Sequence, residues 1–362
     1  MIYLDHAATT PICNAAKKEL IEHLDTFGNP SSVHALGHNA RWFIEDARAR
    51  VAKCINAEPS EIFFTSGGSE ANTLVLNKRQ QHVISSTFEH HSVHVLHNII
   101  PANNDGFIET NKLNSYLSTW WAEVVSCMMV NNEIGTIQPV KELAAITHQY
   151  GDVFFHTDAV QAIGHIPVDV KDINCDMLTA SGHKFGGLKG VGFIYIKNGA
   201  SVNPLIYGGK QESDIRPGTE NVLGILTMAT ALEDAVEHME ERTKYVKSLR
   251  DKMLDRLLKI KSAHLNGSLD NRVHSNINIR FDGVPGARLV TLCSLYGICI
   301  SSGSACNEGI AQPSHVLKAI GLSDEDALNS VRITIGHENT EDEILQAVNI
   351  ITGLVDRIRA DE

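Results

Sequence analysis

Lys184 lies in a glycine-rich turn that directly follows an apolar segment. The turn reads Ser181-Gly182-His183-Lys184-Phe185-Gly186-Gly187, and residues 177–180 before it have the composition of a buried strand. A lysine shielded from water at the carboxyl edge of a sheet could form a Schiff base with an aldehyde cofactor. A surface lysine in a tight turn would have the same local sequence, so Lys184 alone leaves both interpretations open.

Asp158 follows a predicted strand at residues 153–156 and precedes Lys184 by 26 positions. A pyridoxal phosphate ring needs an anion opposite its ring nitrogen, because the protonated ring acts as the electron sink. Asp158 and Lys184 on neighbouring strand ends could hold such a ring between them. An aspartate after a strand is also a common helix N-cap, so this position too has two interpretations.

A glycine turn, Ser66-Gly67-Gly68, connects a predicted strand at 62–65 to a predicted helix at 69–76. Glycines permit close approach to the backbone, and a helix N-terminus offers free N–H groups to a phosphate. The turn lacks the lysine of a P-loop and the spacing of a dinucleotide fingerprint. It therefore predicts a generic anion site or a plain capping turn.

Cys306 lies in a small, polar segment that reads Ser301-Ser302-Gly303-Ser304-Ala305-Cys306-Asn307-Glu308-Gly309. Cys293 and Cys299, by contrast, lie in an apolar segment typical of a core. An exposed loop suits a thiol that must travel between a reaction centre and an acceptor. No lysine or arginine adjoins Cys306, so activation of the thiol must come from the fold or a cofactor.

Three histidines, His90, His94 and His97, have the spacing of one helix face, which is also a metal-ligand spacing. No glutamate completes an H-E-x-x-H motif, and we expect no metal. A single histidine that stacks on a cofactor ring or transfers protons fits better. His90 is favoured because it lies nearest the preceding strand.

Short apolar segments alternate with helical patterns through the first two thirds of the chain, which predicts an α/β fold with a mainly parallel sheet. A charged helical stretch at 221–260 predicts a long connecting helix, and a smaller α+β unit follows it. Apolar residues recur at helical spacing over 39–55. The remaining elements are predicted strands at 82–85, 124–130 and 191–196, and a predicted helix at 141–150.

The composition narrows the function classes. The 362 residues carry 31 Lys and Arg against 43 Asp and Glu, a net charge of −12, which argues against a general nucleic-acid binder. No apolar segment is long enough to span a bilayer, and the N-terminus does not resemble a secretory signal. Seven cysteines without a C-x-x-C pair indicate free thiols. We therefore expect a cytoplasmic protein.

Taken together, the motifs resemble those of the cysteine desulfurases of iron–sulfur-cluster assembly and nitrogen fixation, in the class V aminotransferase group of pyridoxal phosphate enzymes. The resemblance covers nearly the whole chain. Its segments are Tyr3–Pro11, Phe27–Gly37, Phe63–Leu74, Val130–Pro139, His156–Gly164, Ser181–Gly192, Arg216–Asn221, Ser301–Cys306, Pro313–Gly321 and Val331–Gly336. Each is a weak signal alone, but their joint order and spacing are specific.

The resemblance implies the role of each site residue. Lys184 carries the cofactor, Cys306 accepts the sulfur, and His90 stacks on the ring and transfers protons. The other cofactor-binding residues implied are Asp158 at the ring nitrogen, Gln161 and Asn132 at the phenolic oxygen, and Gly68, Ser69, Ser181 and His183 at the phosphate, with Thr219 reaching it from a second subunit. Arg332, with Asn29 and Asn132, is the implied substrate site.

The resemblance also implies fold type I of the pyridoxal phosphate enzymes. The large domain, with a mostly parallel seven-stranded sheet, is expected at 13–240, and the small α+β domain at 1–12 and 241–362. The implied reaction converts L-cysteine to L-alanine and leaves a persulfide on Cys306. A homodimer and a sulfur-acceptor protein are the implied partners, and neither membrane nor direct nucleic-acid binding is expected.

Three alternatives remain open from the sequence. The first is another reaction on the same scaffold: amino transfer, epimerisation or selenocysteine lysis. The second is a non-catalytic adaptor that binds a sulfur-relay partner, and the third is a metal-binding module on the histidine face. The chain also departs from the resemblance at Asn307-Glu308 and at Ser213-Asp214, where relatives often carry Thr or Ser and a basic residue, respectively. These departures concern the sulfur acceptor rather than the cofactor site.

Overall fold

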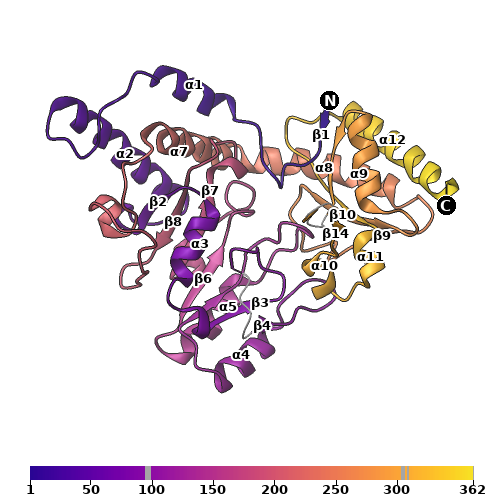
Figure 1. Ribbon diagram of the computed structural model, residues 1–362, viewed down its shortest axis with the longest axis horizontal. Helices are drawn as coiled ribbons and strands as arrows, with labels where there is room; N and C mark the ends of the chain where they lie inside the picture. The colour runs from indigo at the N-terminus through magenta and orange to yellow at the C-terminus, as the bar shows by residue number, and fades with distance from the viewer. Residues whose placement is uncertain (94–98, 303–305, 308–309, 362) are drawn as a thin grey trace.

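The computed structural model describes residues 1–93, 99–302, 306–307 and 310–361 (Figure 1). Its centre is a seven-stranded sheet in the order β2-β8-β7-β6-β5-β3-β4. The strands are β2 (Ile62–Thr65), β8 (Gly192–Ile196), β7 (Met177–Ser181), β6 (Phe154–Asp158), β5 (Val124–Ser126), β3 (Val83–Ser86) and β4 (Ile99–Ile100). β8 runs antiparallel to both neighbours and the other pairs are parallel, which confirms the predicted mostly parallel seven-stranded sheet.

The side chains of the central strands alternate between two apolar layers, as the two-residue period of a strand requires. On β8, Phe193 and Tyr195 join the core beneath α2 and α7, whereas Ile194 and Ile196 join the smaller core beneath α3. The sheet is therefore buried on both faces. The elements around it are α1 (Asn14–Glu22), α2 (Ala35–Cys54), α3 (Gly68–Leu76), α4 (Thr110–Thr119), α5 (Val140–Thr147), α6 (Val170–Ile173) and α7 (Val222–Glu237).

A second, four-stranded antiparallel sheet has the order β12-β15-β10-β9. Figure 1 shows α8, α9 and α12 around this sheet, beside both chain termini. The elements of this part are β1 (Ile2–Tyr3), α8 (Met239–Leu257), β9 (Ala263–Leu265), β10 (Asn276–Phe281), α9 (Gly286–Leu295), β11 (Ile298–Cys299), β12 (Ser301–Ser302), β13 (Cys306–Asn307), β14 (Ile310–Ala311), α10 (His315–Ala319), α11 (Asp324–Leu328), β15 (Ser330–Thr334) and α12 (Glu341–Ala360).

The apolar cores support the two-domain division without testing its boundaries, so that division stays a prediction. One core combines Ile2 and Leu4 with residues of α8, β10, α9, β15 and α12. β1 pairs in parallel with β11, which ties the N-terminus to this part of the chain. Val316, Leu317 and Ile320 of α10 and its C-terminal flank, however, join the core of the large sheet.

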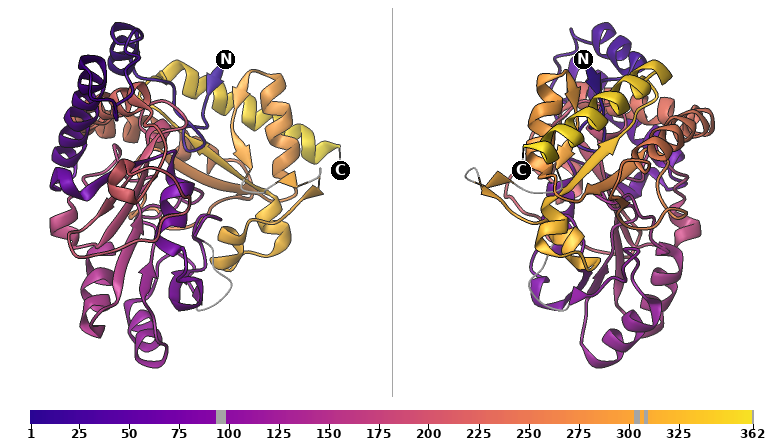
Figure 2. Two further views of the ribbon diagram at one scale, coloured as in Figure 1. Left: turned by 60° about the vertical axis from the view of Figure 1, so that its left-hand side comes forward. Right: turned by 90° about the vertical axis from the view of Figure 1, so that its right-hand side faces the viewer.

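Two predicted elements differ from the structure. The stretch 221–260, expected to hold a long connecting helix, forms two helices, because the chain bends at His238 between α7 and α8. At the bend the His238 ring Nδ1 lies 2.9 Å from the Asp234 carbonyl oxygen. The predicted strand over 124–130 ends at Ser126. Beyond that point the chain turns into a loop closed by a bridge between Val130 and Ile137. In the right-hand view of Figure 2, β13 and β14 project from the smaller part.

Candidate active site

A cleft opens at the carboxyl edge of β6 and β7, between the two sheets. It encloses about 690 Å³, part of it open to solvent. Its walls come from the first turn of α3, the ends of β6 and β7, residue 332 of β15 and the N-terminal segment. The lining residues are Ala7, Ala8, Gly68, Ser69, Asn72, His90, Met128, Asn132, Asp158, Val160, Gln161, Ser181, His183, Lys184 and Arg332.

Asp158 and Lys184 lie at the same edge of the sheet because β6 and β7 are parallel neighbours, with Asp158 opposite Thr179. The Asp158 carboxylate is 3% exposed. One oxygen accepts a hydrogen bond from Asn72 Nδ2 at 2.7 Å and the other from the Val160 backbone N–H at 2.9 Å. These donors orient the carboxylate and compensate for its burial.

Lys184 ends a short 3₁₀ turn, Gly182–Lys184, directly after β7. Its Nζ donates to the carbonyl oxygens of Ala7 at 2.6 Å and Ala8 at 2.9 Å. Burial and the nearby Arg332 guanidinium lower the pKa of Lys184 to about 8. A larger share of the amine is therefore neutral near pH 7 than for an ordinary lysine, which suits a Schiff-base nucleophile.

The first turn of α3 has no side-chain cap, so its N–H groups are open to a ligand in the cleft. Gly67, its N-cap residue, has φ +153° and no side chain to satisfy the free N–H groups of the helix. Ser69 and Ser181 place hydroxyl groups in the same cleft. Glu70 does not counter an anion here, because its carboxylate accepts from the Ser66 N–H at 2.9 Å and pairs with Arg216 at 3.0 Å. The turn has the free donors that a phosphate group requires.

Arg332 enters the cleft from the smaller sheet. Its Nη1 donates to the Asn132 carbonyl oxygen and its Nη2 to Asp5 Oδ1, both at 2.9 Å. Its Nε is buried without a hydrogen-bond partner among the described residues. A guanidinium held in this way presents remaining N–H groups to a planar carboxylate. Gln161 lies nearby and donates from Nε2 to the Ala7 carbonyl oxygen at 2.9 Å.

His90 follows β3 and lines the opposite wall of the cleft. Its Nδ1 lies 2.7 Å from Ser92 Oγ and 3.1 Å from the Ser92 backbone nitrogen. Partial burial is the main cause that lowers the pKa of His90. Asn72 Nδ2 donates to the same Ser92 hydroxyl at 2.9 Å. The cleft thus carries a hydrogen-bonded chain from His90 to Asp158.

Sequence reasoning missed Asn72, Ser92 and the buried acid Glu89. Glu89 is 0% exposed; its Oε1 accepts from Ser86 Oγ at 2.6 Å and from the Met128 N–H at 2.9 Å. Burial raises the pKa of Glu89 to about 8. The one available signal was helical spacing, which places Asn72 one turn after Gly68 on the face toward Asp158.

Two expected site residues lie outside the cleft of their own chain, and a third is described only by its backbone. Asn29 and Thr219 are exposed, and neither lines the cleft of its own chain. Cys306 lies in β13, which pairs with β14, but its side chain lies outside the description, as do residues 303–305 and 308–309. Their roles stay predictions.

The predicted metal face is also only partly described. Residues 91–93 form a turn rather than a helix, while His94 and His97 lie outside the described residues. Across the described residues, no cluster of three or more histidine, cysteine or acidic side chains could hold a metal ion.

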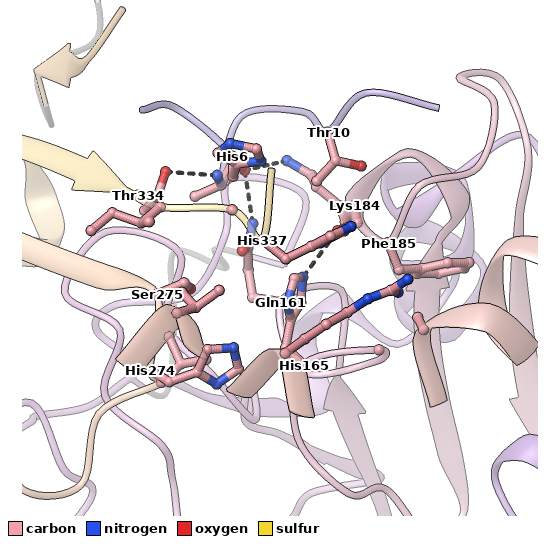
Figure 3. Close-up of a pocket in the computed structure, with 18 of the residues that line it drawn as sticks. His6, Thr10, Gln161, His165, Lys184, Phe185, His274, Ser275, Thr334 and His337 are labelled. Atoms are coloured by element: carbon pink, nitrogen blue, oxygen red, sulfur yellow. Dashed lines mark hydrogen bonds between the residues drawn. The ribbon is translucent and has the colours of Figure 1, made fainter. Parts of the chain in front are cut away.

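Lys184 also borders a second cavity, of about 860 Å³, shown in Figure 3. Four histidines line it: His6, His165, His274 and His337. Burial lowers the pKa of each ring, to about 3 for His274. The histidine walls on this side of the lysine are therefore polar but largely uncharged near pH 7.

Comparison with known proteins identifies the family to which the chain belongs. The aminotransferase class-V family model matches residues 2–346, and the chain belongs to this family of pyridoxal phosphate enzymes. A relative from Dictyoglomus turgidum, named cysteine desulfurase IscS, is 40% identical and aligns over 99% of this chain and 95% of its own.

Two solved structures extend the comparison. The NifS-like protein of Rickettsia africae has a TM-score of 0.92 and 32% identity over 98% of this chain and 99% of its own. A second structure, described as SspA in complex with cysteine, has a TM-score of 0.79 and 31% identity over 94% of this chain and 100% of its own. The buried Asp158, the lysine of lowered pKa and the uncapped helix fit the ring nitrogen, aldehyde and phosphate of pyridoxal phosphate, respectively.

Proposed function

We propose that this chain is a pyridoxal-phosphate-dependent cysteine desulfurase that converts L-cysteine to L-alanine and carries the released sulfur as a persulfide on Cys306. The observation that carries the proposal is the juxtaposition of Asp158, Lys184 and Arg332 in one cleft. These groups match the ring nitrogen, the aldehyde and the substrate carboxylate. The cysteine desulfurase relatives support the choice of substrate.

Bound pyridoxal phosphate supplies an electron sink for the carbon skeleton of the substrate. Asp158 keeps a negative charge against the ring nitrogen, held there by Asn72 and the Val160 N–H. Lys184 would hold the cofactor through Nζ, and the same amine would move the Cα proton of the substrate. Arg332 and Asn132 orient the substrate carboxylate.

The remaining cleft residues hold the cofactor in place. His90 would stack on the ring, and Gln161 and Asn132 would bind at the phenolic oxygen. The free N–H groups of α3 would bind the phosphate, since a helix N-terminus favours an anion. Its proposed contacts are Gly68, Ser69, Ser181 and His183, with Thr219 of the second subunit.

Cys306 performs the sulfur transfer. Its thiolate attacks the substrate sulfur and forms the S–S bond while the substrate C–S bond breaks. The electron pair of that bond stays with the carbon skeleton, which takes up one proton at Cβ, regains the proton removed from Cα and leaves as alanine. The enzyme keeps the sulfur as a persulfide, which an acceptor protein for iron–sulfur clusters or another sulfur pathway removes.

We propose a homodimer, and the surface beside Asn29 and Thr219 supports this proposal. Exposed apolar side chains gather on the loops that carry these residues: Phe27 is 80% exposed, Val33 90% and Tyr207 100%. Apolar residues of this size on a monomer surface indicate an interface. We propose a second copy of the chain as the occupant, because Asn29 and Thr219 could then reach the partner's cleft.

The dimer proposal is tested by Tyr207→Glu, with Trp121→Glu as the control, since Trp121 is also exposed, at 71%, but lies after α4. Light scattering should show a monomer for the first variant and a dimer for the second. A dimer for both variants, or a monomeric wild-type protein, would exclude this interface.

We also propose a cytoplasmic location. No helix within the described residues is long and apolar enough to cross a bilayer. The six cysteines with described side chains are unpaired, which is typical of a reducing compartment.

The activity is tested with Cys306→Ala. The variant should retain the visible absorption of the bound cofactor and lose alanine and sulfide formation. Cys299→Ala is the matched control and should keep both. Keto-acid-dependent amino transfer by the wild-type enzyme, without alanine formation from cysteine, would favour an aminotransferase instead.

A further inference from the structure

His90 and Asp158 are joined by two intervening side chains, and the donors along this path can be assigned. Asn72 is 1% exposed and its amide nitrogen lies 2.7 Å from Asp158 Oδ2 and 2.9 Å from Ser92 Oγ. A carboxylate oxygen can only accept, so the group that faces it must be the NH₂ of Asn72. The second amide hydrogen then points to the Ser92 hydroxyl, which accepts it.

The donor and acceptor at the next hydrogen bond, between Ser92 and His90, can be assigned in the same way. Because the Ser92 oxygen accepts from Asn72, its own hydrogen is free to donate to His90 Nδ1 at 2.7 Å. The Ser92 backbone N–H, which can only donate, points to the same ring atom at 3.1 Å. Two donors therefore converge on Nδ1, and a hydrogen on that atom would be repelled by the backbone N–H.

We infer that Asn72 and Ser92 are positioning residues that hold His90 as the neutral tautomer with its hydrogen on Nε2. In this state the ring stacks on the cofactor and can donate a hydrogen bond from Nε2, but it has no free ring nitrogen to accept a proton. The Cα proton is then left to Lys184. The inference rests on the proposed function for its catalytic meaning, while the tautomer itself can be measured without turnover.

The charged and titratable groups around His90 are consistent with a neutral ring. Asp158 favours the charged form of His90, whereas His91 and Lys184 oppose it. Glu89, which precedes His90, is buried with a raised pKa and is largely uncharged near pH 7. The His315 ring lies 4.7 Å from that of His91, whose ring lies 6.3 Å from that of His90.

The test is ¹⁵N nuclear magnetic resonance of protein labelled at the histidine rings, recorded between pH 6 and 8 with and without pyridoxal phosphate. His90→Asn identifies the His90 signals. In the wild-type protein we expect Nδ1 to be unprotonated and Nε2 to carry hydrogen throughout this range. A hydrogen on Nδ1, in either the neutral or the charged ring, would overturn the inference.

Two variants test the positioning residues, and Asn77→Ala is the control. Asn77 is the C-cap residue of α3, the helix that carries Asn72, and its side-chain amide donates to the Asn203 and Pro204 carbonyl oxygens, away from the cleft. Ser92→Ala and Asn72→Ala should each raise the pKa of His90 and mix its tautomers. Asn72→Ala should also weaken cofactor retention about tenfold, since Asp158 loses a charged hydrogen bond.

Unchanged His90 signals in Ser92→Ala would overturn the inference, even if Asn72→Ala fails to fold. A wild-type protein that shows the expected tautomer but makes no alanine from cysteine would refute the proposed function and leave the inference standing. The two failures are thus distinguishable.

Discussion

Arg332 and Asp5 form an ion pair of 2.9 Å that joins β15 of the smaller sheet to the N-terminal segment beneath Lys184. The pair is shielded, with side-chain exposures of 10% and 21%. The same N-terminal segment supplies the Ala7 and Ala8 carbonyl oxygens that hold Lys184 Nζ. One short stretch of chain therefore positions both Arg332, the proposed substrate-binding residue, and Lys184, the proposed cofactor-binding residue.

Replacing Arg332 by lysine should raise the KM for cysteine by about 10- to 100-fold, because a point charge cannot reproduce two parallel hydrogen bonds to a carboxylate. The bound-cofactor absorption should be unchanged. Arg288→Lys is the control, since Arg288 is exposed and pairs with Asp361. An unchanged KM in steady-state assays of Arg332→Lys would remove this residue from the substrate site.

The lowered pKa of Lys184 predicts how the apoenzyme captures its cofactor. Only the neutral amine attacks an aldehyde, so the rate of Schiff-base formation should rise with pH and reach half its maximum near pH 8. Stopped-flow absorption can follow the reaction. The same reaction with Nα-acetyl-lysine amide, which has a free ε-amine in water, corrects for titration of the cofactor itself.

Arg332 lowers the pKa of Lys184, so Arg332→Leu should move the midpoint of cofactor capture to higher pH. A wild-type midpoint near the ordinary lysine value of about 10.4 would show that the amine is not desolvated.

Glu89 should make apoenzyme stability depend on pH. Its pKa is raised from 4.5 to about 8, so the folded state binds a proton that the unfolded state releases between these values. Stability should therefore fall as pH rises from about 5 through 8, by an amount on the order of a few kcal/mol. Glu89→Gln should flatten this decline in urea unfolding, whereas Glu142→Gln on the surface should not. Parallel curves for wild type and Glu89→Gln would mean that Glu89 is ionised when buried.

The glycine cradle should be sensitive to a single methyl group. A Cβ on Gly68 would lie 2.7 Å from Cγ2 of Val160, whose backbone N–H donates to Asp158. Gly68→Ala should weaken cofactor affinity about tenfold as measured by equilibrium dialysis. Gly151→Ala, with φ +79° but no atom within 4 Å of the added Cβ, is the control for backbone strain alone. Equal affinity in the two variants would argue against the cradle.

Local sequence predicted the strand ends well, because alternating apolar residues and glycine turns determine them within a few positions. The strand over 62–65 was predicted at its observed bounds, and Asp158 and Lys184 lie at one edge as expected. Asn72 and Ser92 were missed because their contacts join residues 20 and 86 positions apart.

The break at His238 escaped prediction for a different reason. Helical periodicity and charge continue through residue 238, while the backbone of His238 leaves the helical conformation, with φ −99° and ψ 10°. The ion pair between Arg332 and Asp5 could not be predicted from local sequence either, because the two residues are 327 positions apart.

Sulfur tracing tests the central claim most directly. Holoenzyme is mixed with sulfur-labelled L-cysteine in the absence of an acceptor or reductant, and the alkylated protein is digested for mass spectrometry. The account predicts one labelled sulfur on Cys306 for each alanine released, and no label there in Lys184→Ala. Alanine formed with the label on another cysteine, or label on Cys306 in Lys184→Ala, would contradict it.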